Sequence, residues 1–266
     1  MARVKKFKNV YSHITAQISK KGGLVIVVID PPNQSTETAG KIAKICTQCG
    51  VDAIAVGGSI GAQGEQLHET IEEIKNNTTL PVILFPGNIA SLSSKADALY
   101  FMSMLNSEDP YYITGAQIAS SLEVKKMGLE VIPTSYIIVE PGRAAGWVGK
   151  AKLIPRELPY LAAVTALAGQ YMGSKLAILE SGGGASKPAP LEMIKATSET
   201  IDIPLLIAGG VRTPKYAYQV IKAGADIIHV GTAVEEKSKN FSGLKKKITA
   251  FVTAVKKAGK EKKKKR

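Results

Sequence analysis

The chain has 266 residues, of which 45% are hydrophobic, so it is long enough to bury one sizeable core. No apolar stretch approaches the ~20 residues of a membrane span, and the basic N-terminus lacks the apolar h-region of a secretory signal peptide, so we expect a cytoplasmic protein. The net charge of +13 invites a nucleic-acid partner, but only 6% of residues are aromatic and none interleave with basic residues as a base-stacking platform requires, so no nucleic acid is expected.

Strand-like runs alternate with helix-like runs along the chain, which is the pattern of a βα architecture. Eight runs predict buried parallel strands because they are apolar almost throughout; they span residues 24–30, 53–56, 81–85, 97–101, 131–139, 175–180, 204–211 and 225–232. Helices are predicted between them at residues 35–49, 66–76, 155–172, 190–199 and 214–222. The fold class is therefore α/β, a single (β/α)8 TIM barrel over residues 1–254.

The two cysteines, Cys46 and Cys49, form a single Cys-x-x-Cys inside the first of these helices. Without a second pair, a structural zinc site is not indicated. We expect two cytosolic thiols, with a redox role as the alternative.

Active-site residues of such a barrel lie at the C-terminal ends of the strands. Asp30 ends the first strand, where a carboxylate can bind Mg²⁺ together with water and substrate phosphates. Ser59 ends the second strand and can add a hydroxyl or position a metal-bound water. The alternative is that Asp30 caps its own turn.

A glycine-rich segment follows the sixth strand. Three successive glycines, Gly182–Gly184, expose N–H groups to a phosphate, and Gly209-Gly210 and Gly231-Thr232 end the next two strands, where barrels commonly bind phosphate. Glu180 would lie near the rest of the ligand and accept a proton from a hydroxyl. The segment is neither a dinucleotide fingerprint nor a Walker loop. Flexible connectors and tight turns without a ligand are the alternative.

Aromatic residues mark an apolar channel as a further possibility. Tyr136 and Trp147 flank the end of the fifth strand, and the runs 101–105 and 111–112 are candidates for an apolar groove. Core packing is the alternative for each. His229 lies inside the eighth strand and is expected to be structural.

The excess positive charge is concentrated at the C-terminus. Residues 256–266 hold seven lysines, one arginine and one glutamate, a net +7 of the chain's +13. We expect residues 255–266 to form a frayed, disordered basic tail. The tail can touch anionic lipid headgroups or RNA, or remain solvated.

Seven motifs in the right order resemble the geranylgeranylglyceryl phosphate synthase family; they are residues 29–31, 56–59, 85–88, 136–139, 179–185, 209–212 and 230–232. The resemblance implies a barrel prenyltransferase that joins sn-glycerol 1-phosphate to geranylgeranyl diphosphate, with Mg²⁺, and releases diphosphate in archaeal membrane phospholipid synthesis. Contact with a membrane surface is expected where the lipidic substrate or product meets it.

The resemblance also assigns residues. It implies that Asp30 and Ser59 hold magnesium, that Glu180 is the base or orienter of the attacking hydroxyl, and that Tyr136 is a second catalytic candidate. The implied sn-glycerol 1-phosphate site consists of Leu179, Glu180, Ser181, Gly182, Gly183, Gly184, Ala185, Gly209, Gly210, Gly231 and Thr232.

Two departures bear on the details. The glycerophosphate loop reads Glu-Ser-Gly-Gly-Gly rather than the family's frequent Glu-Ala-Gly-Ser-Gly, which should preserve the backbone cradle. The long 136–149 segment resembles the larger archaeal group, which implies a homo-oligomer, a dimer or a hexamer. Bacterial heptaprenylglyceryl phosphate synthases are similar, so the prenyl length stays open.

Two other functions compete with this hypothesis. One is a phosphosugar isomerase or lyase that uses Asp30 and Glu180, and the other is a basic binding protein without catalysis.

Overall fold

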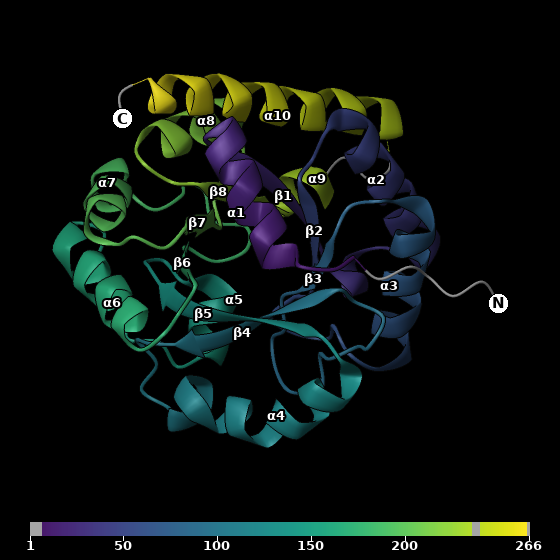
Figure 1. Ribbon diagram of the computed structural model, residues 1–266, viewed down its shortest axis with the longest axis horizontal. Coiled ribbons are helices and arrows are strands. Elements are labelled where there is room, and N and C mark those ends of the chain that lie inside the picture. Colours follow the sequence, from purple (N-terminus) through teal and green to yellow (C-terminus); the bar gives the residue numbers. More distant parts are fainter. Residues whose placement is uncertain (1–6, 236–239, 265–266) are drawn as a thin grey trace.

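Eight parallel strands close into a barrel in the order of the chain, with helices around the outside (Figure 1). This computed structural model describes residues 7–235 and 240–264. The strands are β1 (Leu24–Ile29), β2 (Ala53–Val56), β3 (Val82–Leu84), β4 (Ala98–Met104), β5 (Glu130–Ile138), β6 (Leu176–Glu180), β7 (Leu205–Ala208) and β8 (Ile227–Val230). The predicted barrel and all eight predicted strands are confirmed, with ends that move by a few residues.

The helices lie between and around these strands: α1 (Val10–Lys21), η1 (Pro31–Asn33), α2 (Thr36–Cys49), α3 (Gly64–Asn77), η2 (Tyr111–Gly115), α4 (Ala116–Met127), α5 (Arg143–Val148), α6 (Pro159–Tyr171), α7 (Leu191–Thr200), α8 (Pro214–Lys222), α9 (Thr232–Glu235) and α10 (Phe241–Lys263). Helix α2 begins with a side-chain cap, because the Ser35 hydroxyl accepts the Thr38 N–H. The helix predicted from residue 155 begins four residues later, after a turn in which Leu158 N–H bonds Pro155 O.

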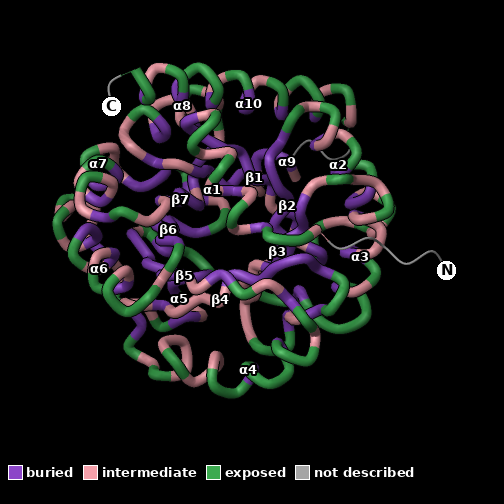
Figure 2. Tube along the Cα trace, viewed as in Figure 1, coloured by how far each residue is buried: buried purple, intermediate pink, exposed green. Residues whose placement is uncertain are grey.

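Alternation along the strands sorts the core into two layers. Residues facing outward, such as Val25 and Leu179, pack under the helices, and residues facing inward, such as Ile26 and Ile178, fill the barrel. Most strand residues are buried, while the outer faces of the helices are exposed (Figure 2). Because Glu180 lies two residues after Ile178, the same alternation turns its side chain into the barrel.

Helix α1 closes the barrel at the N-terminal ends of the strands. Val10 and Ile14 pack into the interior layer, and the Glu130 carboxylate of β5 accepts the Val10 and Tyr11 N–H groups at 2.5 and 2.8 Å. A carboxylate at a helix N-terminus satisfies donors that have no partner within the helix. This end of the barrel is therefore sealed, and the opposite end carries the site.

The C-terminal segment is a helix, so the prediction of a disordered tail from residue 255 is wrong. Helix α10 packs against α8 and α2 with one apolar face that includes Phe251 and Val255. Lys262 is 9% exposed, and its ammonium donates to Ala225 O and to Asp226 Oδ1 at 2.8 and 2.9 Å. A charge run that finds buried partners extends the helix instead of fraying. Residues 265–266 lie outside the described residues.

No helix in the described part of the chain is both long enough and apolar enough to cross a membrane.

Candidate active site

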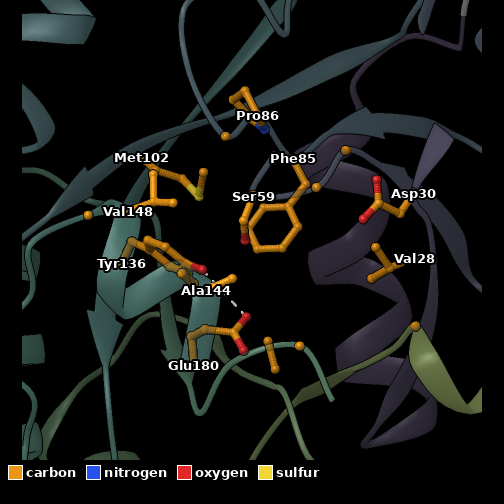
Figure 3. Close-up of a pocket in the computed structure, with 18 of the residues that line it drawn as sticks. Val28, Asp30, Ser59, Phe85, Pro86, Met102, Tyr136, Ala144, Val148 and Glu180 are labelled. Atoms are coloured by element: carbon orange, nitrogen blue, oxygen red, sulfur yellow. Dashed lines mark hydrogen bonds between the residues drawn. The ribbon is translucent and has the colours of Figure 1, made fainter. Parts of the chain in front are cut away.

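The C-terminal ends of the strands surround a cavity of about 510 Å³ (Figure 3). Its lining includes most of the predicted site: Asp30, Ser59, Tyr136, Glu180, Gly183, Gly184, Ala185, Gly209, Gly210, Gly231 and Thr232. The other three predicted residues, Leu179, Ser181 and Gly182, lie behind this surface. Leu179 and Ser181 are fully buried in the wall.

Glu180 is the most buried acid in the cavity. Its side chain is 5% exposed, and its Oε1 accepts the Gly182 N–H at 2.6 Å. Its Oε2 accepts the Tyr136 hydroxyl at 3.5 Å. Burial raises the pKa of Glu180 to about 7, against the lowering effect of these two hydrogen bonds. A carboxylate with a pKa near neutrality is suited to accept a proton from a substrate hydroxyl.

Gly209 permits this arrangement by having no side chain. A Cβ on Gly209 would lie 2.4 Å from Glu180 Oε1 and 2.6 Å from the Gly182 nitrogen, and the residue has a φ of 72°. Both the close approach and the left-handed backbone require glycine here. The end of β7 and the loop after β6 therefore interlock around the Glu180 carboxylate.

Two arginines that the sequence analysis did not single out lie beside the glycine-rich loops that follow β6 and β7. A Cβ on Gly184 would lie 3.7 Å from Arg143 Nη2, and Arg212 lines the cavity two residues after Gly210. Guanidinium groups beside exposed N–H groups favour an anion. The signal in the sequence is weak, because each arginine is a single residue in a loop.

Asp30 lies on another side of the same cavity. Its Oδ1 is buried without a hydrogen-bond partner, and its Oδ2 accepts only a long bond of 3.4 Å from Asn33 Nδ2. Burial, and secondarily the Glu235 carboxylate, raise the pKa of Asp30 to about 7. Glu235 of α9 also lines the cavity and was missed from the sequence, because nothing local marks it.

The neighbouring strand makes room for this carboxylate. A Cβ on Gly58 would lie 2.2 Å from Asp30 Oδ1, so any larger residue here would displace the Asp30 carboxylate from this position. In the described residues, no group of three or more His, Cys, Asp or Glu side chains is placed to hold a metal ion. An unpartnered carboxylate oxygen with few protein ligands around it fits Mg²⁺, which usually keeps waters and substrate phosphates in its shell.

Aromatic side chains form the floor of the cavity. Four rings line the cavity: Phe85 directly after β3, Tyr100 on β4, Tyr136 on β5 and His229 on β8. Burial lowers the pKa of His229 to about 3, so its imidazole is neutral at physiological pH. His229 was expected to be structural; it is buried in β8 and also lines the cavity.

An apolar arm extends from the cavity toward α4. It is lined by Leu99, Phe101, Met102, Met104, Tyr111, Tyr112, Ala116, Gln117 and Ser120. Both predicted groove segments, 101–105 and 111–112, thus contribute to it. Trp147 does not belong to the lining and is 82% exposed, so its expected place at a channel or in the core is wrong.

Comparison with known proteins decides the family, because the model of the PcrB family matches residues 16–255. The chain belongs to the PcrB family. A geranylgeranylglyceryl phosphate synthase of Pyrococcus horikoshii is 50% identical over 246 residues, which cover 92% of this chain and 96% of the relative. The family resemblance inferred from the motifs is therefore confirmed.

Solved structures of PcrB-family relatives share the fold. The crystal structure of (S)-3-O-geranylgeranylglyceryl phosphate synthase from Thermoplasma acidophilum in complex with sn-glycerol-1-phosphate matches with a TM-score of 0.87 and 33% identity, covering 94% of this chain and 99% of that one. The Thermoplasma volcanium enzyme matches with a TM-score of 0.88 and 35% identity, covering 94% and 98%.

Proposed function

We propose that this PcrB-family enzyme forms the ether bond between sn-glycerol 1-phosphate and geranylgeranyl diphosphate and releases diphosphate, in archaeal membrane phospholipid synthesis. One observation carries the proposal: a buried carboxylate, Glu180, with a raised pKa, interlocked with a glycine cradle for a phosphate and facing an apolar arm. The identity of the substrate is inferred from the relatives, since the structure of a similar enzyme is a complex with sn-glycerol-1-phosphate.

The phosphate loops orient the nucleophile. The N–H groups of Gly183 and Gly184, with Arg143 and Arg212 nearby, hold the phosphate of sn-glycerol 1-phosphate. The far hydroxyl of the glycerol then lies toward Glu180. Its oxygen bonds to C1 of the prenyl chain, its proton passes to the Glu180 carboxylate, and the C1–O electron pair leaves with diphosphate.

Asp30 and Ser59 are the residues that would hold Mg²⁺ on the other side of the cavity. The unpartnered Asp30 Oδ1 supports this assignment, since a buried carboxylate oxygen calls for a cation or a donor. When bound, Mg²⁺ neutralises charge on the leaving diphosphate.

The apolar arm accommodates the prenyl chain. Its side chains are for the most part aliphatic, aromatic or methionine, and the arm belongs to the same cavity as Asp30 and Glu180. Burial of each methylene there contributes about 0.8 kcal/mol, which favours a long chain over a short one. The assay below determines whether the enzyme uses geranylgeranyl diphosphate or a heptaprenyl donor.

We also propose a homo-oligomer in the cytoplasm. Large apolar side chains are exposed on two helices: Ile118 and Leu122 on α4, and Tyr160, Val164 and Tyr171 on α6. Exposed apolar patches favour association with another surface. Cys46 and Cys49 are free thiols, as a reducing compartment favours. Light scattering of the purified protein tests the oligomer, and a monomer at all concentrations overturns it.

A product assay tests the proposed function. The purified protein receives Mg²⁺, radiolabelled sn-glycerol 1-phosphate and, separately, farnesyl, geranylgeranyl and heptaprenyl diphosphates. We expect an extractable ether with geranylgeranyl diphosphate, no product with EDTA, and recovery when Mg²⁺ is restored. Absence of product with every donor overturns the proposal and returns the phosphosugar isomerase hypothesis, which phosphosugar ligands would then test.

A further inference from the structure

Phe85 is the centre of the aromatic floor. Its ring centroid lies 5.9 Å from that of Tyr100, 5.8 Å from Tyr136 and 5.2 Å from His229. All three contacts are edge-to-face, with interplanar angles of 88°, 87° and 76°. Such contacts are the preferred geometry of aromatic pairs, and three of them fix the orientation of one ring.

Exposure distinguishes Phe85 from the rings that hold it. Tyr100, Tyr136 and His229 are buried at 0%, 7% and 4% exposure, whereas Phe85 is partly exposed and lines the cavity. Figure 3 shows its ring between Asp30 on one side and Tyr136 with Glu180 on the other. The fixed ring therefore borders the space between the two carboxylates.

The aromatic floor carries no positive charge. Burial lowers the pKa of His229 to about 3, so its ring stays neutral, and its Nε2 lies 3.3 Å from the Tyr100 hydroxyl. Burial also raises the pKa of Tyr100 and of Tyr136 above the usual tyrosine value, so both stay uncharged at neutral pH. Neutral aromatic rings attract a cation through their ring quadrupoles.

We propose that Phe85 is a catalytic residue that stabilises the positive charge developing on the allylic carbon. The inference rests on the proposed function. As the C1–O bond of the prenyl diphosphate breaks, its electron pair leaves with diphosphate and C1 becomes cationic beside the Phe85 ring. The glycerol oxygen then bonds to C1 and its proton passes to Glu180, which restores neutrality at carbon. The ring contributes more in the transition state than in the ground state, so it acts on kcat.

Fluorination of the ring tests the electrostatic part. Replacing Phe85 by phenylalanines with one, two and three ring fluorines keeps its shape and weakens its π face stepwise. We expect log kcat to fall with each fluorine, to a total of roughly tenfold, and the KM for prenyl diphosphate to change little. A flat kcat across the series, in an enzyme that still makes the ether, overturns the role of Phe85 and leaves the proposed function intact. If the unmodified enzyme makes no ether, the proposed function fails first, and this inference with it.

A binding measurement gives a readout that does not depend on turnover. The probe is a prenyl chain ending in a quaternary ammonium, compared with its uncharged tert-butyl isostere, both with diphosphate and Mg²⁺ in a calorimeter. We expect Phe85→Leu to weaken the ammonium probe about tenfold more than the isostere. The matched control is Phe101→Leu in the apolar arm, which should weaken both probes equally. Equal losses at Phe85 as well would show that its ring only packs.

Discussion

The two ends of the barrel bury acids in opposite ways. At the end closed by α1, Asp97 Oδ2 accepts the Val82 N–H at 2.9 Å while Oδ1 pairs with Lys75, and Asp52 Oδ2 accepts the Val25 N–H at 2.9 Å. At the open end, Asp30 keeps an unpartnered oxygen, and Glu180 has two hydrogen bonds but no ion pair with a described cation. Burial raises the pKa of both open-end acids to about 7.

The two groups of buried acids therefore serve different purposes: those at the closed end stabilise the fold, and those at the open end are available for chemistry. Charge that is compensated at the closed end holds strands and helices together, so this face of the barrel contributes to stability. Charge left uncompensated at the open end is available to a substrate or a cation, at a cost in stability. The same residue type therefore has a different role at each end, and substitutions can test this separately.

The largest effect is expected from Glu180→Gln. The amide keeps the shape of the side chain but accepts no proton, so kcat should fall by about 10²–10⁴. In the parent enzyme, a carboxylate that must be ionised gives activity that rises with pH through its pKa, about 7 for Glu180, and reaches a plateau above it. On the proposed assignment of Mg²⁺ to Asp30, saturating metal keeps that carboxylate ionised, so the remaining acid limb belongs to Glu180. Steady-state rates across pH measure both effects.

The control for this variant is Glu192→Gln on the exposed start of α7. It changes the same charge away from the cavity and should alter neither kcat nor the acid limb. An unchanged kcat in Glu180→Gln would contradict the role of Glu180 as base.

The next effect belongs to the closed end. Asp97→Asn leaves the Lys75 ammonium, whose side chain is 5% exposed, buried without its partner. Breaking a buried ion pair from one side costs about 3–5 kcal/mol of unfolding free energy. Urea unfolding measures this loss, and the KM for sn-glycerol 1-phosphate in the protein that remains folded should be unchanged. A shift below 1 kcal/mol would remove the contrast between the two ends.

A smaller effect of opposite sign is expected on the stability of Glu180→Gln. The raised pKa means that the folded state binds this proton more tightly than the unfolded state. The stability it contributes is full below the ordinary glutamate value of 4.5 and is lost as pH rises through about 7. At about pH 8 the variant should therefore be more stable than the parent, by at most about 3 kcal/mol, and at about pH 4 the two should match. Thermal unfolding at both pH values checks the sign, and a destabilised variant at high pH would refute it.

Most of the barrel could be predicted from the sequence because each strand is a local apolar run that ends in glycine or a polar residue. The ends of those runs also marked Asp30, Glu180 and the phosphate loops. Helix α10 was wrongly predicted to be disordered for two reasons. Its many lysines obscure the apolar face in the sequence, and the partners of Lys262 are residues 224–226, which are distant from it in the chain. Phe85 and Glu235 acquire their places only when the barrel closes, since their neighbours come from other strands.

The smallest effect sharpens the comparison at the open end itself. The Tyr136 hydroxyl donates to Glu180 Oε2 over 3.5 Å, a long bond that lowers the pKa of Glu180 against the larger effect of burial. In Tyr136→Phe this donor is lost, so the pKa of Glu180 should rise above 7 and the acid limb should move to higher pH, with kcat on the plateau reduced only about two- to fivefold. Tyr100→Phe is the matched control, since that hydroxyl faces His229 rather than the carboxylate and its loss should leave the limb in place. A limb that moves equally in both variants would mean that the pH dependence reports the aromatic floor as a whole and not the hydrogen bond to Glu180.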